Sequence, residues 1–360
     1  MYKRQDQRGR RKEYGGGFGS SLGQALGGIK NGAESIRQLV LLVALIALPA
    51  VGLSRYMQRV ISLIFIYSML ALSLNIITGY MGQISLGHAA FYAIGAYTSG
   101  LLSEHFGWNF LITCVCGIIM TCFIGWLFSL PTMKLSGTYL AIITMGFGEI
   151  VKVLIVNWES LTHGTYGLQN IKKPELFGIT LKTTNNGMYY LCLVFLVLMV
   201  LLCIAIERSK LGRTLRAIKD DPLASSLMGI ELGHYKRLAF TISTAMAGCC
   251  GALYAHLSGY VDANSFNSDV SMMILSIVIF GGMGSIKGML LGAVVLVSFP
   301  EVLRFLAEYR FIVYGLILIV MMVFRTDGLL GGPSKRPYVF PRFVKVKEQG
   351  GEPNGVSGSK

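Results

Sequence analysis

Residues 79–100 read GYMGQISLGHAAFYAIGAYTSG and lie between two apolar runs. The stretch combines five glycines with aromatic side chains and one histidine, His88, and an ordinary membrane anchor requires none of these. Gly79 and Gly82 are expected to break the chain at the cytoplasmic end of the preceding apolar segment, with a helix restarting near Ile84. A broken helix of this kind lets a transporter line a cavity with backbone groups at membrane depth.

Small residues recur at helical spacing after this break and predict a face that another helix can approach closely. They are Ala89, Ala93, Ala96 and Gly100. The aromatic residues Phe91, Tyr92 and Tyr97 lie off this stripe. We therefore expect a packing and gating element. Two roles stay open for His88, a hydrogen bond to a neighbouring helix or a place on a transport pathway with Ser85.

The composition of the whole chain indicates a polytopic membrane protein. Its 360 residues are 53% hydrophobic and 14% charged, whereas soluble domains have roughly 25% charged residues. The mean hydropathy is +0.59. Several apolar runs are long enough to cross about 30 Å of hydrocarbon. The runs are continuous rather than alternating, which favours an all-α bundle over a β-barrel.

The formal net charge of +14 follows the positive-inside pattern rather than a nucleic-acid-binding pattern. Basic residues gather in the N-terminal tail, in residues 207–237 and in the C-terminal tail, so these segments are expected in the cytoplasm. We predict a disordered basic tail at 1–37, a transmembrane domain at 38–330 and a cytoplasmic tail at 331–360. The loop at 157–187 is then external, either a passive connector or a docking surface for an external partner.

About ten transmembrane or half-spanning helices are expected. They lie near residues 39–53, 60–77, 84–103, 111–130, 138–156, 188–206, 238–258, 270–282, 288–307 and 311–324. Cytoplasmic location of both termini requires an even number of crossings. Residues 270–307 therefore count as two crossings or as one re-entrant pair, with a break at GGMGSIKG, residues 281–288.

No catalytic, metal-binding or nucleotide-binding motif is present, so neither an enzyme activity nor a cofactor is predicted. The seven cysteines fall in apolar runs without a C-x-x-C pair and are expected to be reduced packing residues. Energy for transport would then come from a partner or an ion gradient. Glu149 and Lys152, three residues apart on one predicted helix, form either a neutralised interfacial pair or part of a pathway.

The basic loop at 207–237 has a defined local pattern. In residues 211–219, LGRTLRAIK, the apolar residues share one helix face. Asp221 and Pro222 then predict the cap and first position of a second short helix, which Gly229 ends. Such a helix suits insertion into a groove on a cytosolic partner, or it rests on the bilayer surface.

The chain resembles the permease subunits of branched-chain amino-acid ABC importers of the LivM type, over roughly residues 60–332. Five blocks in order carry the resemblance. They are TGYMGQISLGHAAFYAIGAY at 78–97, SGTYLAIITMGFGEIVK at 136–152, NWESLTHGTYGL at 157–168, SKLGRTLRAIKDDPLASSLMGIELGHYKRLAF at 209–240 and FGGMGSIKGMLLGA at 280–293.

The resemblance implies a multi-pass protein of the bacterial inner membrane that imports branched-chain amino acids. Its expected partners are two cytosolic ATP-binding subunits, a second permease subunit, an external substrate-binding protein and membrane lipid, but no nucleic acid. The alternatives are an importer of urea or short-chain amides and an ion-coupled amino-acid carrier.

Residues 223–229, LASSLMG, match the family's ATPase-coupling loop, although Leu223 and Ser225 depart from its usual Glu and Ala. The expected coupling residues are Arg213, Arg216, Asp220, Asp221, Ala224, Ser225 and Gly229. The candidate pathway residues are Ser85, His88, Phe91, Tyr92 and Glu149. A further departure is His163, which occupies a position where the family usually has glycine.

Overall fold

The computed structural model describes residues 54–132, 134–135, 137–169, 171–176, 179–180, 186–302, and Gly315, Ile319, Gly328 and Leu329. The predicted segment at 39–53 and the two terminal tails lie outside the described residues. Only Gly315 and Ile319 of the predicted segment at 311–324 are described. The predicted total of ten helices is therefore not tested.

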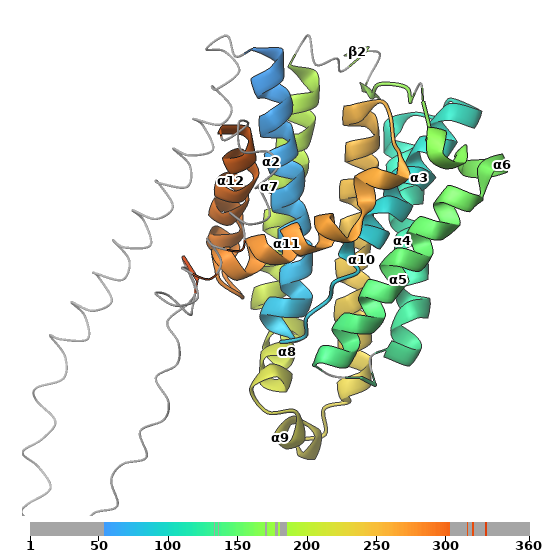
Figure 1. Cartoon of the computed structure of the whole chain (residues 1–360). Helices are drawn as coiled ribbons and strands as arrows, with labels where there is room; N and C mark the ends of the chain where they lie inside the picture. The colour runs from blue at the N-terminus through green and yellow to red at the C-terminus, as the bar shows by residue number, and fades with distance from the viewer. Residues whose placement is uncertain are drawn as a thin grey trace, which may run out of the picture.

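The described chain is an all-α helical bundle, as predicted (Figure 1). The long helices are α2 (Arg55–Asn75), α3 (His88–Phe106), α4 (Phe110–Thr132), α5 (Thr138–Asn157), α7 (Gly187–Arg208) and α10 (Leu232–Ser258). The shorter helices are η2 (Ile76–Tyr80), α6 (Glu159–Thr162), η3 (Gly164–Tyr166), α8 (Lys210–Asp220), α9 (Pro222–Leu227), η5 (Ala263–Phe266), α11 (Ser268–Gly281) and α12 (Ile286–Val302). Two two-residue strands, β1 (Glu175–Leu176) and β2 (Ile179–Thr180), pair antiparallel in the loop between η3 and α7.

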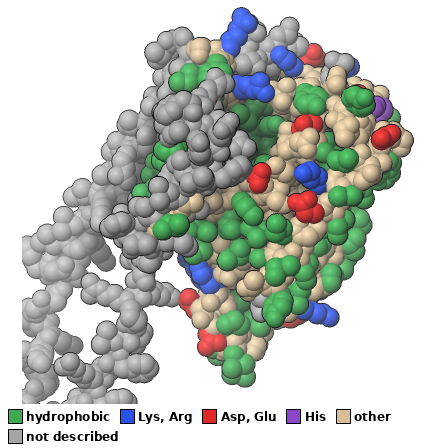
Figure 2. Space-filling view, in the orientation of Figure 1, with side chains coloured by type: hydrophobic (Ala, Val, Ile, Leu, Met, Phe, Trp, Pro, Cys, Tyr) green, Lys and Arg blue, Asp and Glu red, His purple; other side chains and the backbone are tan. Residues whose placement is uncertain are grey.

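Six helices of the described chain are long and apolar enough to cross a membrane. They are Arg55–Tyr80, Phe110–Thr132, Thr138–Asn157, Gly187–Arg208, Leu232–Ser258 and Ala263–Gly281. α2 and α10 are mostly buried inside the bundle, whereas α4 and α5 expose much of their apolar surface. Figure 2 shows apolar side chains spread over the visible face of the bundle. Such a surface suits lipid or a second membrane subunit.

The predicted break between the apolar runs at 270–282 and 288–307 is confirmed. α11 ends at Gly281 and α12 begins at Ile286, and the turn between them uses the positive φ angles of Gly282 and Gly284. α11 lies across the bundle at a steep angle to α10, while α12 runs more nearly along the bundle (Figure 1). Whether these helices form two crossings or one re-entrant pair stays a prediction.

The break after α2 is also present, but the predicted restart near Ile84 is wrong. The last turn of α2 widens into the π-helix η2, residues 81–87 are not helical, and α3 begins only at His88. In Figure 1 this connection runs from the α8 end of the bundle towards its middle. Packing against α5 explains the late start, because a Cβ on Gly87 would lie 2.1 Å from the carbonyl oxygen of Thr144.

Small residues bring α3 and α10 into close contact. All four residues of the predicted stripe, Ala89, Ala93, Ala96 and Gly100, are buried. Two glycines outside this stripe make still closer approaches. An added Cβ on Gly95 would lie 2.3 Å from the carbonyl oxygen of Gly248, and one on Gly251 would lie 2.2 Å from the carbonyl oxygen of Tyr92. A Cβ on Gly251 would lie 2.6 Å from the amide nitrogen of Ala96. Glycine on both helices therefore lets the two backbones touch.

Candidate coupling loop and intramembrane helix break

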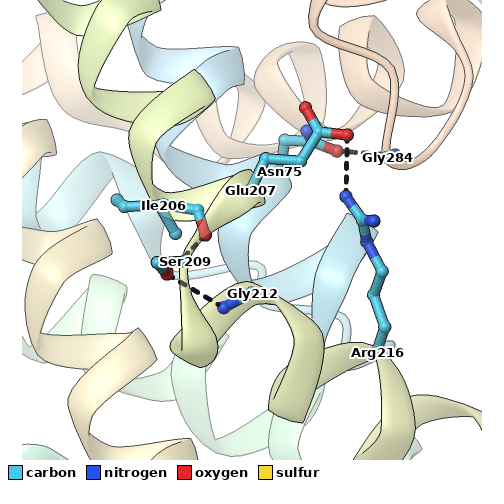
Figure 3. A network of polar contacts seen from close by, with 7 residues as sticks. All are labelled: Asn75, Ile206, Glu207, Ser209, Gly212, Arg216 and Gly284. Atoms are coloured by element: carbon cyan, nitrogen blue, oxygen red, sulfur yellow. Dashed lines mark hydrogen bonds and ion pairs between the residues drawn. The ribbon is translucent and has the colours of Figure 1, made fainter.

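A tight joint fixes α8 to the end of α7 (Figure 3). The Ser209 hydroxyl donates to the carbonyl of Ile206 (2.7 Å) and accepts from the amide of Gly212 (3.3 Å), so it caps α8. A Cβ on Gly212 would lie 2.3 Å from the Ile206 carbonyl oxygen, which leaves no room for a side chain. Leu215 and Ile218 are buried, as the helical pattern predicted. α8 is thus anchored at its start and along one face.

The second short helix begins and ends as its sequence predicts. The Asp221 carboxylate accepts from the amides of Leu223 (2.9 Å) and Ala224 (3.0 Å), and Pro222 takes the first helical position. Gly229, with φ of 82°, follows the helix. The two bonds to Asp221 satisfy amides at the start of α9. The positive φ of Gly229 turns the chain away after the helix, a conformation that glycine adopts readily.

α9 carries large apolar side chains on an exposed surface. Leu223, Leu227 and Met228 are 71%, 80% and 84% exposed. The helix projects beyond α8 at the end of the molecule, where Figure 2 shows an apolar tip beside acidic side chains. Of the predicted coupling residues on this helix, Ala224 is exposed and Ser225 is 5% exposed. We name Leu223, Leu227 and Met228 the apolar tip.

The two predicted coupling arginines have different surroundings. Arg216 donates to the carboxylate of Glu207 (2.7 Å), and its guanidinium lies 5.2 Å from the centre of the Tyr80 ring. Arg213 is exposed and forms no ion pair within the described chain. Asp220 is also exposed. Arg216 therefore holds α8 against η2, whereas Arg213 is available to a partner.

Lys219, which sequence reasoning did not select, makes the most direct contact between α8 and the helix break. Its ammonium donates to the carbonyl of Gly79 (2.8 Å). Desolvation by burial lowers the pKa of Lys219, while the nearby Asp220 opposes that shift. A separation of 140 residues along the chain explains why no local pattern points to this contact.

On its other side, η2 contacts the turn between α11 and α12. The amide of Gly284 donates to the side-chain oxygen of Asn75 (2.8 Å), as Figure 3 shows. A Cβ on Gly79 would lie 2.0 Å from the same Asn75 oxygen and 2.7 Å from the Gly284 nitrogen. Gly79 is therefore required by the packing of three segments and not by the turn alone.

Hydroxyl groups from other helices accept hydrogen bonds from the backbone amides where α3 begins. The amide of Leu86 donates to Thr144 (3.0 Å) and that of Ala89 donates to Ser271 (3.0 Å). The side chain of Ser85 is 1% exposed, and its hydroxyl has no hydrogen-bond partner among the described residues. Ser85 is thus a buried polar group, and its place on a transport pathway stays a prediction.

His88 contacts a neighbouring helix. Its Nε2 lies 2.6 Å from the Ser73 hydroxyl of α2, and the carbonyl of Ser73 accepts from the Ser243 hydroxyl of α10 (2.6 Å). His88 is 1% exposed and joins these helices from within the core. The first of the two roles left open for His88 is confirmed by this contact.

Phe91 and Tyr92, two predicted pathway residues, lie in aromatic packing clusters. The ring of Phe91 contacts the rings of Phe128, Phe147 and Phe240. The ring of Tyr92 contacts those of Tyr254 and Phe266. Both residues are at most 2% exposed. Both side chains therefore fill the core around α3, and their place on a pathway stays a prediction.

Glu149 does not pair with Lys152, so the predicted interfacial ion pair is wrong. No nitrogen–oxygen contact within 4.0 Å joins these two described residues. The Glu149 carboxylate instead accepts from the hydroxyl of Ser268, at the start of α11, and its side chain is on an exposed face of α5. Glu149 therefore bonds to a residue of another helix and not to its neighbour on α5.

The loop between α5 and α7 forms a small cap at the opposite end from α9 (Figure 1). The amide of Leu168 donates to the carbonyl of Val261 (2.8 Å), and an open pocket of about 530 Å³ lies between this loop and the end of α3. Its lining residues are Glu104, Glu159, His163, Thr165, Tyr166, Gly167 and Gln169. His163 has φ of 57°, a left-handed conformation that favours glycine, the residue that the family resemblance led us to expect there.

The comparisons with known proteins agree on one family. Residues 56–323 match the family model described as "Branched-chain amino acid transport system / permease component". The LivM permease of the Escherichia coli high-affinity branched-chain amino acid transport system is 36% identical over 84% of this chain and 77% of its own length.

Two further relatives are more distant. The LivH permease of the same Escherichia coli system is 25% identical over 74% of this chain and 92% of its own length. The fructose import permease FrcC of Rhizobium meliloti is 25% identical over 66% of this chain and 68% of its own length. No solved structure matches the chain.

Proposed function

This chain belongs to the family of branched-chain amino acid transport permease components, and from that premise we propose that it is a membrane subunit of an ABC importer. The proposed cargo is a branched-chain amino acid, and cytosolic ATP-binding subunits supply the energy. A second permease subunit and an external substrate-binding protein complete the assembly. The observation that supports this most directly is the apolar tip of α9 at the end of the anchored helix α8.

The apolar tip favours a protein partner. Three large apolar side chains on so short a helix are unfavourable in water, and covering each stabilises a complex by roughly 1.5–3 kcal/mol. Short helices with such a face commonly bind in grooves on partner proteins. A bilayer surface is the alternative, but α9 projects away from the spanning helices rather than lying along them (Figure 1).

Charge supports a cytoplasmic location for α8 and α9. The loop at 207–237 carries the basic residues Arg208, Lys210, Arg213, Arg216, Lys219, Lys236 and Arg237. Such residues accumulate on the cytoplasmic side of membrane proteins. We therefore place this end of the bundle, and both chain termini, in the cytoplasm of a cell whose inner membrane holds the protein. The cap at 157–187 then faces outward and is the proposed docking surface for the substrate-binding protein.

The transport pathway is proposed to pass the helix break between α2 and α3. Residues 81–87 are not helical, and Ser85 adds a buried hydroxyl that has no partner within the described chain. The buried polar side chains of the described residues are hydroxyls, amides and imidazoles, without a buried carboxylate, lysine or arginine. A route with little fixed charge suits an apolar amino acid.

An ion-coupled carrier is the second proposal that the sequence allowed, with Glu149 as its carrier group. Glu149 is exposed on α5 and bonded to Ser268, so it belongs to no buried relay among the described residues. An importer of urea or a short-chain amide would use the same fold and differs only in cargo. Transport assays with leucine and urea in parallel separate these two substrates.

The test is reconstitution of this chain in proteoliposomes. The other components are the ATP-binding subunits, the second permease and the substrate-binding protein that genes beside its own would encode. Labelled leucine should enter only when ATP and all subunits are present. Leu227→Asp should reduce co-purification of the ATP-binding subunits by roughly tenfold or more, because it removes one buried apolar contact and adds a charge. The control is Leu198→Asn on the exposed face of α7, which lies away from the apolar tip. Uptake by this chain alone, driven by an ion gradient, would refute the proposal.

A further inference from the structure

α8 contacts the helix break that precedes α3 through two cationic side chains. Lys219 donates to the carbonyl of Gly79, and Arg216 lies over the ring of Tyr80. Both contacted residues belong to η2, the π-helical end of α2. The helix that leads to the apolar tip is therefore bonded directly to the last turn before residues 81–87.

The Gly79 carbonyl requires a hydrogen-bond donor from outside its own helix, and Lys219 supplies it. The last carbonyls of a helix have no partner within that helix, and in a membrane protein each must find another donor. The Ile77 carbonyl accepts from the amide of Gln83 (3.2 Å), which lies in the same connection. Gly79 instead depends on Lys219, a residue of the cytoplasmic loop. A cation at a helix C-terminus also interacts favourably with the helix dipole.

The side chain of Lys219 fits the surface of the break along its whole length. Its methylene groups cover Gly82, where an added Cβ would lie 2.8 Å from the Lys219 Cγ. Gly82 has φ of 72° and turns the chain away from η2. The stem of Lys219 thus contacts the residue that turns the chain, while its ammonium holds the carbonyl three residues earlier.

We propose that Lys219 is a positioning residue that transmits movement of the ATPase-coupling loop to the helix break at residues 76–87. Its bond to the Gly79 carbonyl holds the break in the conformation seen here, and displacement of α8 by an ATP-binding subunit releases it. The anchor on the opposite side, from Gly284 to Asn75, does not involve the loop, so it holds α2 while the break moves. This inference rests on the proposed importer function.

The first experiment measures coupling in the complete reconstituted importer. Lys219→Met keeps most of the side-chain stem but removes the charge and the hydrogen bond. ATP hydrolysis should persist, while the amount of leucine transported per ATP hydrolysed should fall by roughly tenfold, the effect of losing one charge-assisted hydrogen bond. Lys219→Arg should restore most of the ratio, because it keeps a cationic donor.

The matched control is Lys210→Met, at the exposed start of the same helix. It removes the same charge from α8 without touching the break, so the ratio should stay within about twofold of the wild-type value. An equal loss in Lys210→Met and Lys219→Met would mean that charge on α8, rather than the Gly79 contact, matters. An unchanged ratio in Lys219→Met would overturn the inference.

A second experiment follows the break itself. Ile84 is 44% exposed, so Ile84→Cys gives a reporter for maleimide labelling within residues 81–87. In the complete importer, its labelling rate should differ between the nucleotide-free and the ATP-trapped states, and Lys219→Met should abolish that difference. A nucleotide response that persists in Lys219→Met would overturn the inference.

The two proposals fail in different ways. If the unmutated chain transports leucine without ATP-binding subunits, the importer function fails before any variant is compared. If the unmutated importer transports leucine only with ATP, yet labelling of Ile84→Cys ignores nucleotide, the function stands and the role of Lys219 is wrong. The wild-type measurements therefore separate the two outcomes.

Discussion

The Nε2 atom of His88 lies 2.6 Å from the Ser73 hydroxyl, which also donates to the carbonyl of Leu70 (2.7 Å). A hydroxyl has one hydrogen, so the bond to Leu70 leaves Nε2 as the donor to Ser73. Nδ1 of the neutral ring is then an acceptor, and it has no partner within the described chain. His88 thus links α3 to α2 through one directed hydrogen bond.

This bond predicts that His88 acts mainly through stability. Ser73→Ala should lower the free energy of unfolding by roughly 0.5–2 kcal/mol, the range for hydrogen bonds between membrane helices. His88→Ala should lower the free energy of unfolding by more, about 2 kcal/mol or above, because it also leaves a cavity in the core. Unfolding in mixed micelles of mild detergent and dodecyl sulfate measures both values.

The double variant provides the control. If the two residues act through their shared bond, His88→Ala and Ser73→Ala together should cost less than the sum of the single variants. Leucine uptake by His88→Asn, at a temperature where the variant is folded, should retain the wild-type KM. A raised KM with unchanged stability would show instead that His88 lines the pathway.

The contact between Gly95 and Gly248 predicts strong intolerance of a single methyl group. A Cβ on Gly95 would lie 2.3 Å from a backbone oxygen of α10, so the helices must separate or bend to accept alanine. Gly95→Ala should lower the free energy of unfolding by about 1–3 kcal/mol, as overpacking does in a close-packed core.

Gly146 is the matched control for this substitution. It lies inside α5, and a Cβ there would meet no atom within 4 Å. Gly146→Ala should therefore raise the free energy of unfolding of the isolated chain by about 0.5–1 kcal/mol, because alanine has the higher helix propensity. Equal effects of the two substitutions would contradict the packing of α3 against α10.

Local chemistry made α9 predictable from sequence. Asp221, Pro222 and Gly229 each act within a few residues of their own position, so the cap, first turn and exit follow from residue type. The break after α2 was predictable for the same reason, since Gly82 supplies the positive φ angle. The bundle itself follows from long apolar runs, which have few alternatives in a membrane.

Contacts between distant segments could not be predicted in this way. α3 begins at His88 rather than near Ile84 because Thr144 and Ser271, on other helices, bond the amides around its start. Nothing in the spacing of the glycines reveals those partners. The pairing of Lys219 with Gly79 likewise depends on how α8 folds back onto α2.

Glu149 shows a further limit of local reasoning. A separation of three residues from Lys152 is compatible with an ion pair on one helix, but such pairs gain only about 0.2–0.5 kcal/mol. A hydrogen bond to Ser268 of α11 competes with it, and the structure has that bond instead. Weak local preferences therefore decide little when a tertiary partner is available.

The two coupling arginines should respond differently to charge reversal. Arg216→Glu breaks the pair with Glu207, removes the cation from the Tyr80 ring and brings two carboxylates together. It should lower the free energy of unfolding by about 1 kcal/mol, even though the pair is partly exposed to solvent. Arg213→Glu should change stability by less than about 0.5 kcal/mol, because Arg213 is exposed.

For binding of the ATP-binding subunits, Arg213→Glu should have the larger effect and Arg216→Glu the smaller one. Arg213→Glu alters a charge that a partner can meet, so it should slow association at low salt more than at high salt. Surface plasmon resonance with the detergent-purified chain measures the association rate. A large loss of stability in Arg213→Glu would mean that its side chain has an internal role, contrary to its exposure.

The backbone of His163 predicts an unusual preference for glycine over alanine. With φ of 57°, His163 is in the left-handed region, where a Cβ is unfavourable by about 1–2 kcal/mol. Its imidazole lies 3.7 Å from the carboxylate of Glu104, a partly exposed contact that compensates little of this strain. His163→Gly and His163→Ala both lose the imidazole, but only the glycine variant relieves the backbone.

His163→Gly should therefore be more stable than His163→Ala by about 1 kcal/mol, although glycine is more flexible in the unfolded chain. Unfolding of both variants in mixed detergent micelles gives the difference directly. Gly146 in α5 supplies the opposite case, since alanine should be the more stable residue there. If alanine were also preferred at position 163, the left-handed turn between α6 and η3 would be wrong, and with it the shape of the cap formed by this loop.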